Sequence, residues 1–177
     1  MSARPSPEFG QALIAALPAA RRYATGLCGE RALADDLVQD GIERALQRCE
    51  QLQSLERIGA WLRTIVYNLY MDELRRRRGR GAGVDVAELT NDLSLSTPAR
   101  DGTAMADLTR ATAQLSVEHR QILVLAGVEE LSYREMADEL AVPIGTVMSR
   151  LARARAALRG ALEGATAPSG RTVRGLA

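Results

Sequence analysis

The chain has 177 residues, and its composition favours helices over sheets, because alanine and leucine dominate while aromatic residues make up only 3%. All 23 basic residues are arginines and the net charge is only +1, so any binding of nucleic acid has to rest on local clusters of charge. The chain has only two cysteines and one histidine, which argues against a zinc site and a catalytic triad. It also lacks a glycine-rich phosphate loop, which argues against a nucleotide-driven activity. We therefore expect a protein that is not an enzyme and that uses no metal and no cofactor.

The first predicted unit is a block of helical pattern from Phe9 to Arg78, and within it Asp35–Arg48 is an amphipathic helix. Its expected inner stripe consists of Val38, Ile42, Ala45 and Cys49. Its outer face is acidic and consists of Asp36, Gln39, Asp40 and Glu43. Such a face is either an ordinary solvated surface or a site for a protein partner, and the pattern alone leaves both open.

A second amphipathic helix is predicted for Gly59–Arg78. The residues expected to pack on one side are Trp61, Leu62, Ile65, Val66, Leu69 and Leu74. The residues expected mainly on another side are Arg63, Tyr67, Asn68 and Met71. The helix ends in four consecutive arginines, Arg75–Arg78, with Arg80 just beyond. Arginines in a last turn oppose the helix dipole, but a run this dense favours phosphate contacts, and tyrosine and asparagine beside arginine suit the recognition of unpaired bases.

The helical period is lost between residues 84 and 102, where four acidic residues stand against one arginine. We predict a flexible, net-acidic linker here. Helical periodicity resumes at Met105 and ends near Leu162, and the small polar residues that follow predict a disordered tail. The predicted fold is therefore all-α, with two small helical domains at 9–82 and 104–163, a linker at 83–103 and a tail at 164–177.

Leu131–Leu158 predicts a helix-turn-helix. Ser132 and Glu135 form a capping box at the start of its first helix, and Ala141–Pro143 interrupts the pattern before the second. The expected buried stripe of the first helix is Tyr133, Met136, Ala137 and Leu140, and that of the second is Val147, Leu151, Ala154 and Leu158. The opposite side of the second helix carries Thr146, Ser149 and Arg153, flanked by Met148 and Arg150. This side suits a DNA major groove, and the alternative is an ordinary helical hairpin with solvated arginines.

The chain has no run of 18 apolar residues and no charged segment followed by an apolar core at its N-terminus. We therefore expect neither a membrane span nor a secretion signal. Both cysteines lie in helical patterns, where buried free thiols are expected, and this fits a reducing, cytoplasmic location.

Three segments in this order resemble conserved parts of the sigma factors of bacterial RNA polymerase, in particular the small extracytoplasmic-function group. The helix DDLVQDGIERAL resembles the region-two helix that docks on the polymerase clamp. The segment AWLRTIVYNLYMDELRRRR resembles the helix that meets the minus-10 promoter element. The segment LSYREMADELAVPIGTVMSRLARAR resembles the region-four helix-turn-helix that recognises the minus-35 element. Together they span roughly residues 9–160.

This resemblance implies a protein that binds core RNA polymerase, through the clamp of the largest subunit and the flap of the second, and that directs promoter-specific transcription. It also implies promoter DNA and an anti-sigma factor as partners, and a monomer when free. The implied polymerase-binding residues are Asp36, Gln39, Asp40 and Glu43. The implied minus-10 residues are Ser54, Leu55, Glu56, Trp61, Arg63, Tyr67, Asn68, Arg75 and Arg76. The implied minus-35 residues are Thr146, Met148, Ser149, Arg150, Arg153 and Arg155.

Individual positions carry further expectations from the same resemblance. The loop 53–56 matches the place where a flipped non-template base is held, and Asn68 matches a position close to the minus-10 bases. Trp61 matches a position that helps to open the duplex in primary sigma factors, but in the small group we expect it to be a core residue. Met148 stands where the family often has lysine or arginine, which removes one phosphate or base contact. A sigma mimic that sequesters an anti-sigma factor and a stand-alone helix-turn-helix regulator remain open as alternatives.

Overall fold

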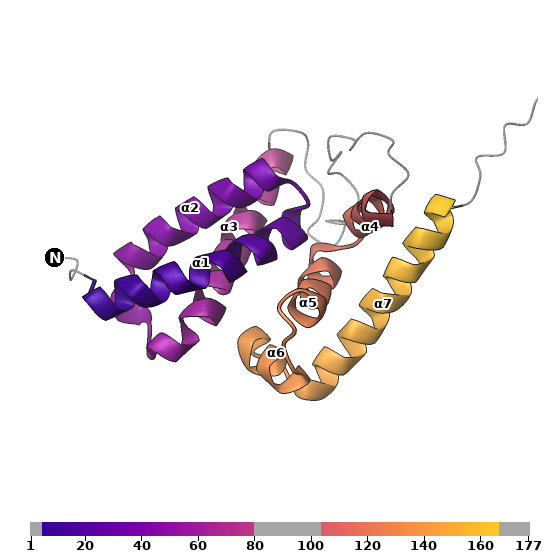
Figure 1. Ribbon diagram of the computed structural model, residues 1–177. Coiled ribbons are helices and arrows are strands. Elements are labelled where there is room, and N and C mark those ends of the chain that lie inside the picture. Colours follow the sequence, from indigo (N-terminus) through magenta and orange to yellow (C-terminus); the bar gives the residue numbers. More distant parts are fainter. Residues whose placement is uncertain (1–4, 80–103, 167–177) are drawn as a thin grey trace, which may run out of the picture.

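The computed structural model describes residues 5–79 and 104–166, and within these two ranges every regular element is a helix (Figure 1). The predicted all-α fold is confirmed for this part of the chain. The predicted linker, residues 83–103, lies outside the described residues. In the described ranges, no helix combines the length and the apolar character that crossing a bilayer requires.

Three long helices form the first unit. They are α1 (Pro7–Cys28), α2 (Arg31–Gln47) and α3 (Ile58–Gly79), and each packs against the other two. Two short 3₁₀ helices, η1 (Cys49–Gln51) and η2 (Leu55–Arg57), lead from α2 into α3. Leu27, Val38, Leu62 and Val66 are almost fully buried between the helices. Burial of these large apolar side chains is the main source of stability for the unit.

Four helices form the second unit. They are α4 (Ala104–Ala113), α5 (Val117–Gly127), α6 (Tyr133–Leu140) and α7 (Ile144–Thr166). The long helix α7 contacts the other three. Its predicted stripe is confirmed, because Val147, Leu151 and Ala154 are buried and Leu158 is half-buried. The helix continues to Thr166, three residues beyond the expected end of the domain at 163.

The turn between α6 and α7 has the predicted form. The Ser132 hydroxyl accepts from the Glu135 backbone N–H, and the Glu135 carboxylate accepts from the Ser132 backbone N–H, which makes both halves of the capping box. Ala141 ends α6 in the left-handed conformation with φ of 52°. One expectation for α6 is wrong: Tyr133 is 39% exposed, because at the first position of an eight-residue helix its neighbours cover only part of it.

The two units are packed against each other. α1 contacts α5 and α3 contacts α6, and a single cluster of buried apolar side chains includes residues of both units. A Cβ atom at Gly26 of α1 would lie 2.7 Å from a methyl group of Val124 on α5, so the glycine allows the two helices to approach closely. Arg120 of α5 donates to the Leu27 carbonyl at the end of α1. The expectation of two separate domains on a flexible joint did not foresee this shared core.

Candidate nucleic-acid interface

The acidic face of α2 is open to solvent along its length. All four residues predicted for it, Asp36, Gln39, Asp40 and Glu43, are exposed. The other side of the helix is anchored by buried Val38 and Ala45, as predicted, while Ile42 and Cys49 are half-buried. Cys28 is buried and Cys49 is half-buried, and both are free thiols. The packing of α2 thus holds three carboxyl groups on a rigid, accessible surface.

The outward side of α7 presents the residues predicted for the major groove. Arg153, Arg155, Ser149 and Met148 are exposed, and Thr146 and Arg150 are half-buried. The Ser149 hydroxyl donates to the Thr146 carbonyl, and Arg153 Nε donates to the Ser149 carbonyl. These local bonds are exchangeable contacts of exposed side chains. Both groups are therefore free to turn toward another molecule, whereas the buried side of the helix is fixed by the core.

The side of α3 that was predicted to meet unpaired bases is only partly accessible. Asn68 is exposed, and Tyr67 is half-buried. Burial raises the pKa of Tyr67, with a further contribution from the charge of Glu118. Trp61 is half-buried and meets the ring of Phe9 edge to face, with centroids 6.3 Å apart. This packing agrees with the expectation that Trp61 is a core residue.

Arg63 does not lie on an accessible side of α3, and this expectation is wrong. The residue is 8% exposed. Its Nε and Nη2 atoms donate to the two carboxylate oxygens of Glu139 on α6, at 2.8 and 2.5 Å. Its Nη1 atom lies 3.6 Å from a carboxylate oxygen of Glu129, whose side chain is also buried. The physical reason is the packing of the second unit over α3, which supplies two carboxylates to one guanidinium.

We call Arg63, Glu129 and Glu139 the interdomain ion cluster. Burial by itself lowers the pKa of Arg63, but the hydrogen bonds and charge of Glu139, together with the charge of Glu129, raise the pKa above its ordinary value. Arg22 of α1 adds a further ion pair, with its Nε atom 3.5 Å from Glu129. Opposite charges from both units therefore neutralise each other at the contact between α3 and α6.

The loop before α3 lies at the edge of a small cavity. Ser54 caps η2 by accepting from the Glu56 backbone N–H, and Leu55 and Glu56 are exposed. The cavity is about 250 Å³ and is lined by the 3₁₀ segments, by Trp61 and, from the second unit, by Asp138 and Glu139. The site expected to hold a flipped base is thus next to Asp138 and Glu139 of α6, of which Glu139 is paired with Arg63, and Arg57 lines the same cavity.

Three of the arginines at the end of α3 have partners in the same helix. Arg75 pairs with Asp72, and Arg76 and Arg77 both pair with Glu73. These side chains are largely exposed, and pairs of this kind contribute little to stability. These ion pairs can therefore be exchanged for phosphate contacts at a small cost in free energy. In the free chain, however, the three arginines are already paired with acidic side chains.

Sequence reasoning missed the residues of the second unit that meet α3 and α1. From the sequence, no role was expected for Glu129, Glu139 or Arg120. Arg63 and Glu139 are 76 positions apart, and Arg120 and Leu27 are 93 apart, so no local period relates them. Arg120 is only 4% exposed, and the sequence pattern of its own helix does not predict this burial.

Comparison with known proteins places both units in one family. The family described as Sigma-70 region 2 matches residues 13–80, and the family described as Sigma-70, region 4 matches residues 105–158. The ECF RNA polymerase sigma factor EcfG of Rhodopseudomonas palustris is 32% identical over 146 residues, which are 82% of this chain and 80% of that protein. The ECF RNA polymerase sigma factor SigL of Mycobacterium tuberculosis is 38% identical over 144 residues, 78% of this chain and 79% of that protein.

A similar structure is that of the sigma factor RpoE in complex with the anti-sigma factor NepR from Bartonella quintana. The TM-score is 0.68 at 28% sequence identity, and the match covers 89% of this chain and 98% of that chain. The structural match therefore includes both units of the present chain.

Proposed function

The chain belongs to the extracytoplasmic-function group of the sigma-70 family, a group of transcription initiation factors and not enzymes, and we propose that its two helical units contact two separate elements of the same promoter. The proposed domain boundaries are 9–82 for the unit that binds polymerase and the minus-10 element, and 104–163 for the unit that binds the minus-35 element. The single observation that carries this assignment is the order of the two family matches, each of which falls on one of the two packed units.

We propose that α7 enters the major groove of the minus-35 element. The exposed Arg153 and Arg155 would supply base and phosphate contacts, with Ser149 and Thr146 beside them. Met148 is 51% exposed on the same surface but carries no charge, so it would contribute apolar contact in place of a phosphate contact. Exposure of these side chains supports the assignment, since none of them has to leave the core to reach DNA.

We propose that the first unit has two functions on different surfaces. The exposed carboxylates of α2 would bind the clamp of the polymerase, where acidic side chains need a basic partner. Asn68, Tyr67 and the loop at Ser54 would contact unstacked bases of the minus-10 element. Arg75 and Arg76 would exchange their partners in α3 for phosphates.

The packing of the second unit against α3 has a consequence for this function. Arg63 is buried beneath α6, and the cavity beside the loop is walled by Asp138 and Glu139. Contact of the Arg63 side of α3 with promoter DNA therefore requires the two units to separate, whereas Asn68 is already exposed. We infer that the described arrangement is the closed form of the factor. In an open form the two units would be separated, and polymerase would stabilise this open form because it binds the open form more tightly than the closed one.

The proposed partners are core RNA polymerase, promoter DNA and an anti-sigma factor, in analogy with the complex of RpoE and the anti-sigma factor NepR from Bartonella quintana. An anti-sigma factor that binds the closed form would keep both DNA-binding surfaces from acting together. We propose that the factor is a monomer when it is free of these partners.

Run-off transcription tests the proposed function. Purified core polymerase is incubated with a fragmented genomic library, with and without this protein, and the start sites are sequenced. The proposal predicts new start sites that share two upstream elements at a fixed spacing. A sigma mimic would give no new start sites, and a stand-alone regulator would bind its own DNA site tightly without polymerase; either result would overturn the proposal.

A further inference from the structure

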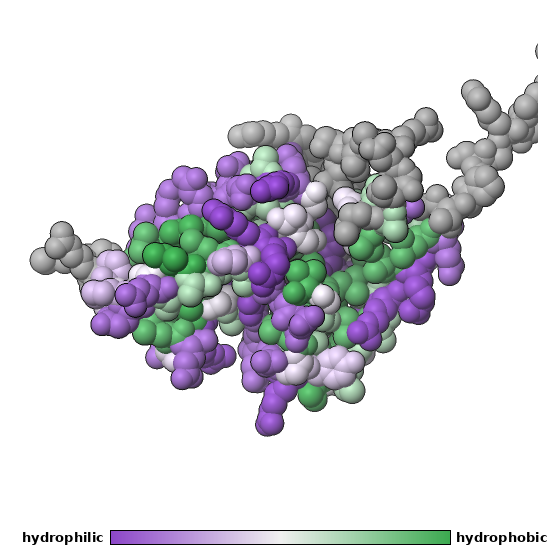
Figure 2. All heavy atoms as spheres, viewed as in Figure 1, coloured by the Kyte–Doolittle hydropathy of each residue, from purple (hydrophilic) through white to green (hydrophobic). Residues whose placement is uncertain are grey.

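The outer surface of α7 is not polar along its whole length. Ile144 and Met148 lie one helical turn apart at its start, and their side chains are 49% and 51% exposed. We call these two residues the apolar edge of α7. In Figure 2, hydrophobic side chains reach the surface where α7 begins next to α6, whereas hydrophilic ones cover much of its outer side farther along.

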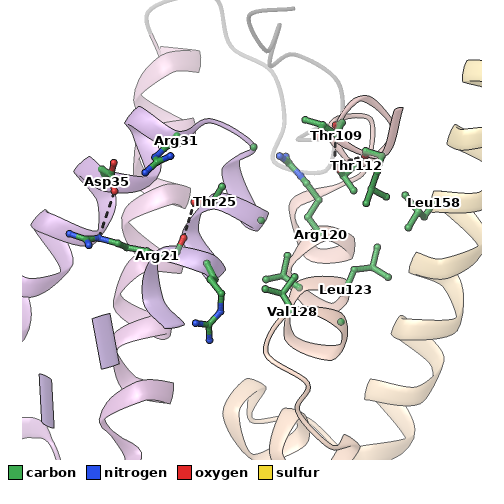
Figure 3. Close-up of a pocket in the computed structure, with 16 residues that line it drawn as sticks. Arg21, Thr25, Arg31, Asp35, Thr109, Thr112, Arg120, Leu123, Val128 and Leu158 are labelled. Atoms are coloured by element: carbon green, nitrogen blue, oxygen red, sulfur yellow. Dashed lines mark hydrogen bonds and ion pairs between the residues drawn. The ribbon is translucent and has the colours of Figure 1, made fainter. Parts of the chain in front are cut away.

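The core of the protein does not use the apolar edge. The inner side of α7 packs through Val147, Leu151 and Ala154, which are at most 2% exposed. Farther along, Leu158 points from α7 toward α5 and lines a groove of about 810 Å³ between the two units (Figure 3). Each residue of a helix is rotated by about 100° from the one before, which turns Met148 away from Val147 and into solvent. The apolar edge would therefore gain free energy from contact with another molecule.

The neighbours of the apolar edge on α7 indicate that this molecule is DNA. Ser149 and Arg153, which we propose for the minus-35 element, are exposed on the outward side of the same turns. Gly145 and Ala152 lie between them and Met148, both exposed, and a Cβ atom at Gly145 would meet open space. Such short residues allow bases to approach the helix closely. The long, flexible Met148 side chain can then lie against a base edge.

The chemistry of the apolar edge selects among the bases. In the major groove the 5-methyl group of thymine is the one apolar group that the four bases present. Methionine and isoleucine side chains offer no strong hydrogen-bond donor or acceptor. Contact with the amino group of cytosine or with the ring nitrogen of a purine would remove water from a polar group and replace it with nothing.

We propose that Ile144 and Met148 recognise thymine methyl groups, so that the factor prefers thymine at one or two positions beside the bases contacted by Ser149 and Arg153. The inference rests on the proposed entry of α7 into the major groove, and it adds which base class this part of the helix selects.

Replacement of thymine by uracil tests the proposal, because it removes the methyl group and leaves base pairing intact. The template is a promoter recovered by run-off transcription, and each thymine of its upstream element is replaced in turn on either strand. Transcription is measured with subsaturating holoenzyme reconstituted from the full-length protein. We expect a loss of about fourfold at one or two positions, which is the effect of one methyl group no longer buried.

Variants of the apolar edge show whether it causes this difference. The double variant Ile144→Ala, Met148→Ala should transcribe the thymine and uracil templates equally well, whereas Ile144→Val, Met148→Leu keeps apolar surface and should retain the difference. Ile14→Ala removes a 68% exposed apolar side chain of α1 and should also retain it. Both residues of the edge are about half exposed, so the melting temperatures should change little.

Several results would overturn the proposal. One is equal transcription by the wild type from thymine and uracil at every position, and another is an upstream element without thymine on either strand. A difference that Ile144→Ala, Met148→Ala retains in full would assign the effect to DNA shape or to another residue. Loss of core polymerase binding by that variant in a pull-down would make the apolar edge a polymerase contact. The absence of transcription from every template would contradict the proposed function itself, so the two failures are distinct.

Discussion

Arg63 of α3 and Glu139 of α6 join the two units through a pair of parallel hydrogen bonds, at 2.8 and 2.5 Å, between residues 76 positions apart. Paired guanidinium and carboxylate groups with this geometry are among the stronger polar contacts in proteins. The bond holds the helix expected to meet the minus-10 element against the helix-turn-helix expected to meet the minus-35 element. The same contact therefore covers part of the surface that we propose for the minus-10 element.

The variant Glu139→Gln should weaken the contact between α3 and α6 by about 1.5–3 kcal/mol, because the neutral amide leaves the buried Arg63 with Glu129 as its only carboxylate partner among the described residues. Hydrogen exchange of the backbone amides of α6 in the free protein measures this, and we expect it to be faster. The control is Asp138→Asn, an exposed carboxyl group of the same helix, which should leave exchange unchanged. Equal exchange in wild type and Glu139→Gln would contradict a stabilising role for the cluster.

Arg153→Ala should reduce promoter-specific transcription by about 5- to 150-fold, which corresponds to the loss of about 1–3 kcal/mol for one base contact, while core binding stays intact. Run-off transcription and a pull-down with core polymerase measure the two effects separately. Arg159→Ala, an exposed arginine farther along α7, serves as the control. Equal losses in both assays would argue that Arg153 has a general and not a DNA-specific role.

Asp40→Arg should abolish binding to core polymerase, since it places a cation in the middle of the acidic face of α2. The side chain is exposed, so the melting temperature should change little. Glu30→Arg, at the exposed residue that precedes α2, is the matched charge reversal. Retention of full core binding by Asp40→Arg would remove the acidic face from the proposed interface.

Ala141→Gly should stabilise the protein by about 0.5–1 kcal/mol, because glycine adopts the left-handed conformation of this turn without the strain that a Cβ atom causes. Thermal unfolding should show a rise of about 1–4 °C. The converse change, Gly29→Ala, introduces a Cβ atom at φ of 75° and should lower the melting temperature. A lower melting temperature for Ala141→Gly would mean that the flexibility of glycine outweighs the relieved strain.

The sequence is sufficient to predict what local periodicity determines. The capping box at Ser132, the apolar stripe of α7 and the exposed face of α2 follow from residues three and four positions apart, and all are present. The burial of Arg63 could not be predicted in this way, because its partners belong to another unit. Residue types that suit DNA contacts, such as arginine beside tyrosine, also suit a buried ion cluster, and only the packing distinguishes them.

The left-handed Ala141 and the groove show the same limit. Pro143 predicts a turn after Leu140, but glycine would have been the usual residue for the conformation found there. The groove is formed by five helices that come together only in the packed form, so no segment of the sequence contains it.

The distance between the two units in the free protein and in the polymerase complex tests the central claim most directly. Dyes at Arg57→Cys and Asp138→Cys, two exposed residues of different units that line the same cavity, report this distance by fluorescence energy transfer in a Cys49→Ser background with Cys28 protected by burial. We expect high transfer for the free protein and clearly lower transfer in a holoenzyme that is active in run-off transcription. Unchanged high transfer in that active holoenzyme would contradict the separation of the two units, since the promoter would then be recognised with the Arg63 side of α3 still covered by α6.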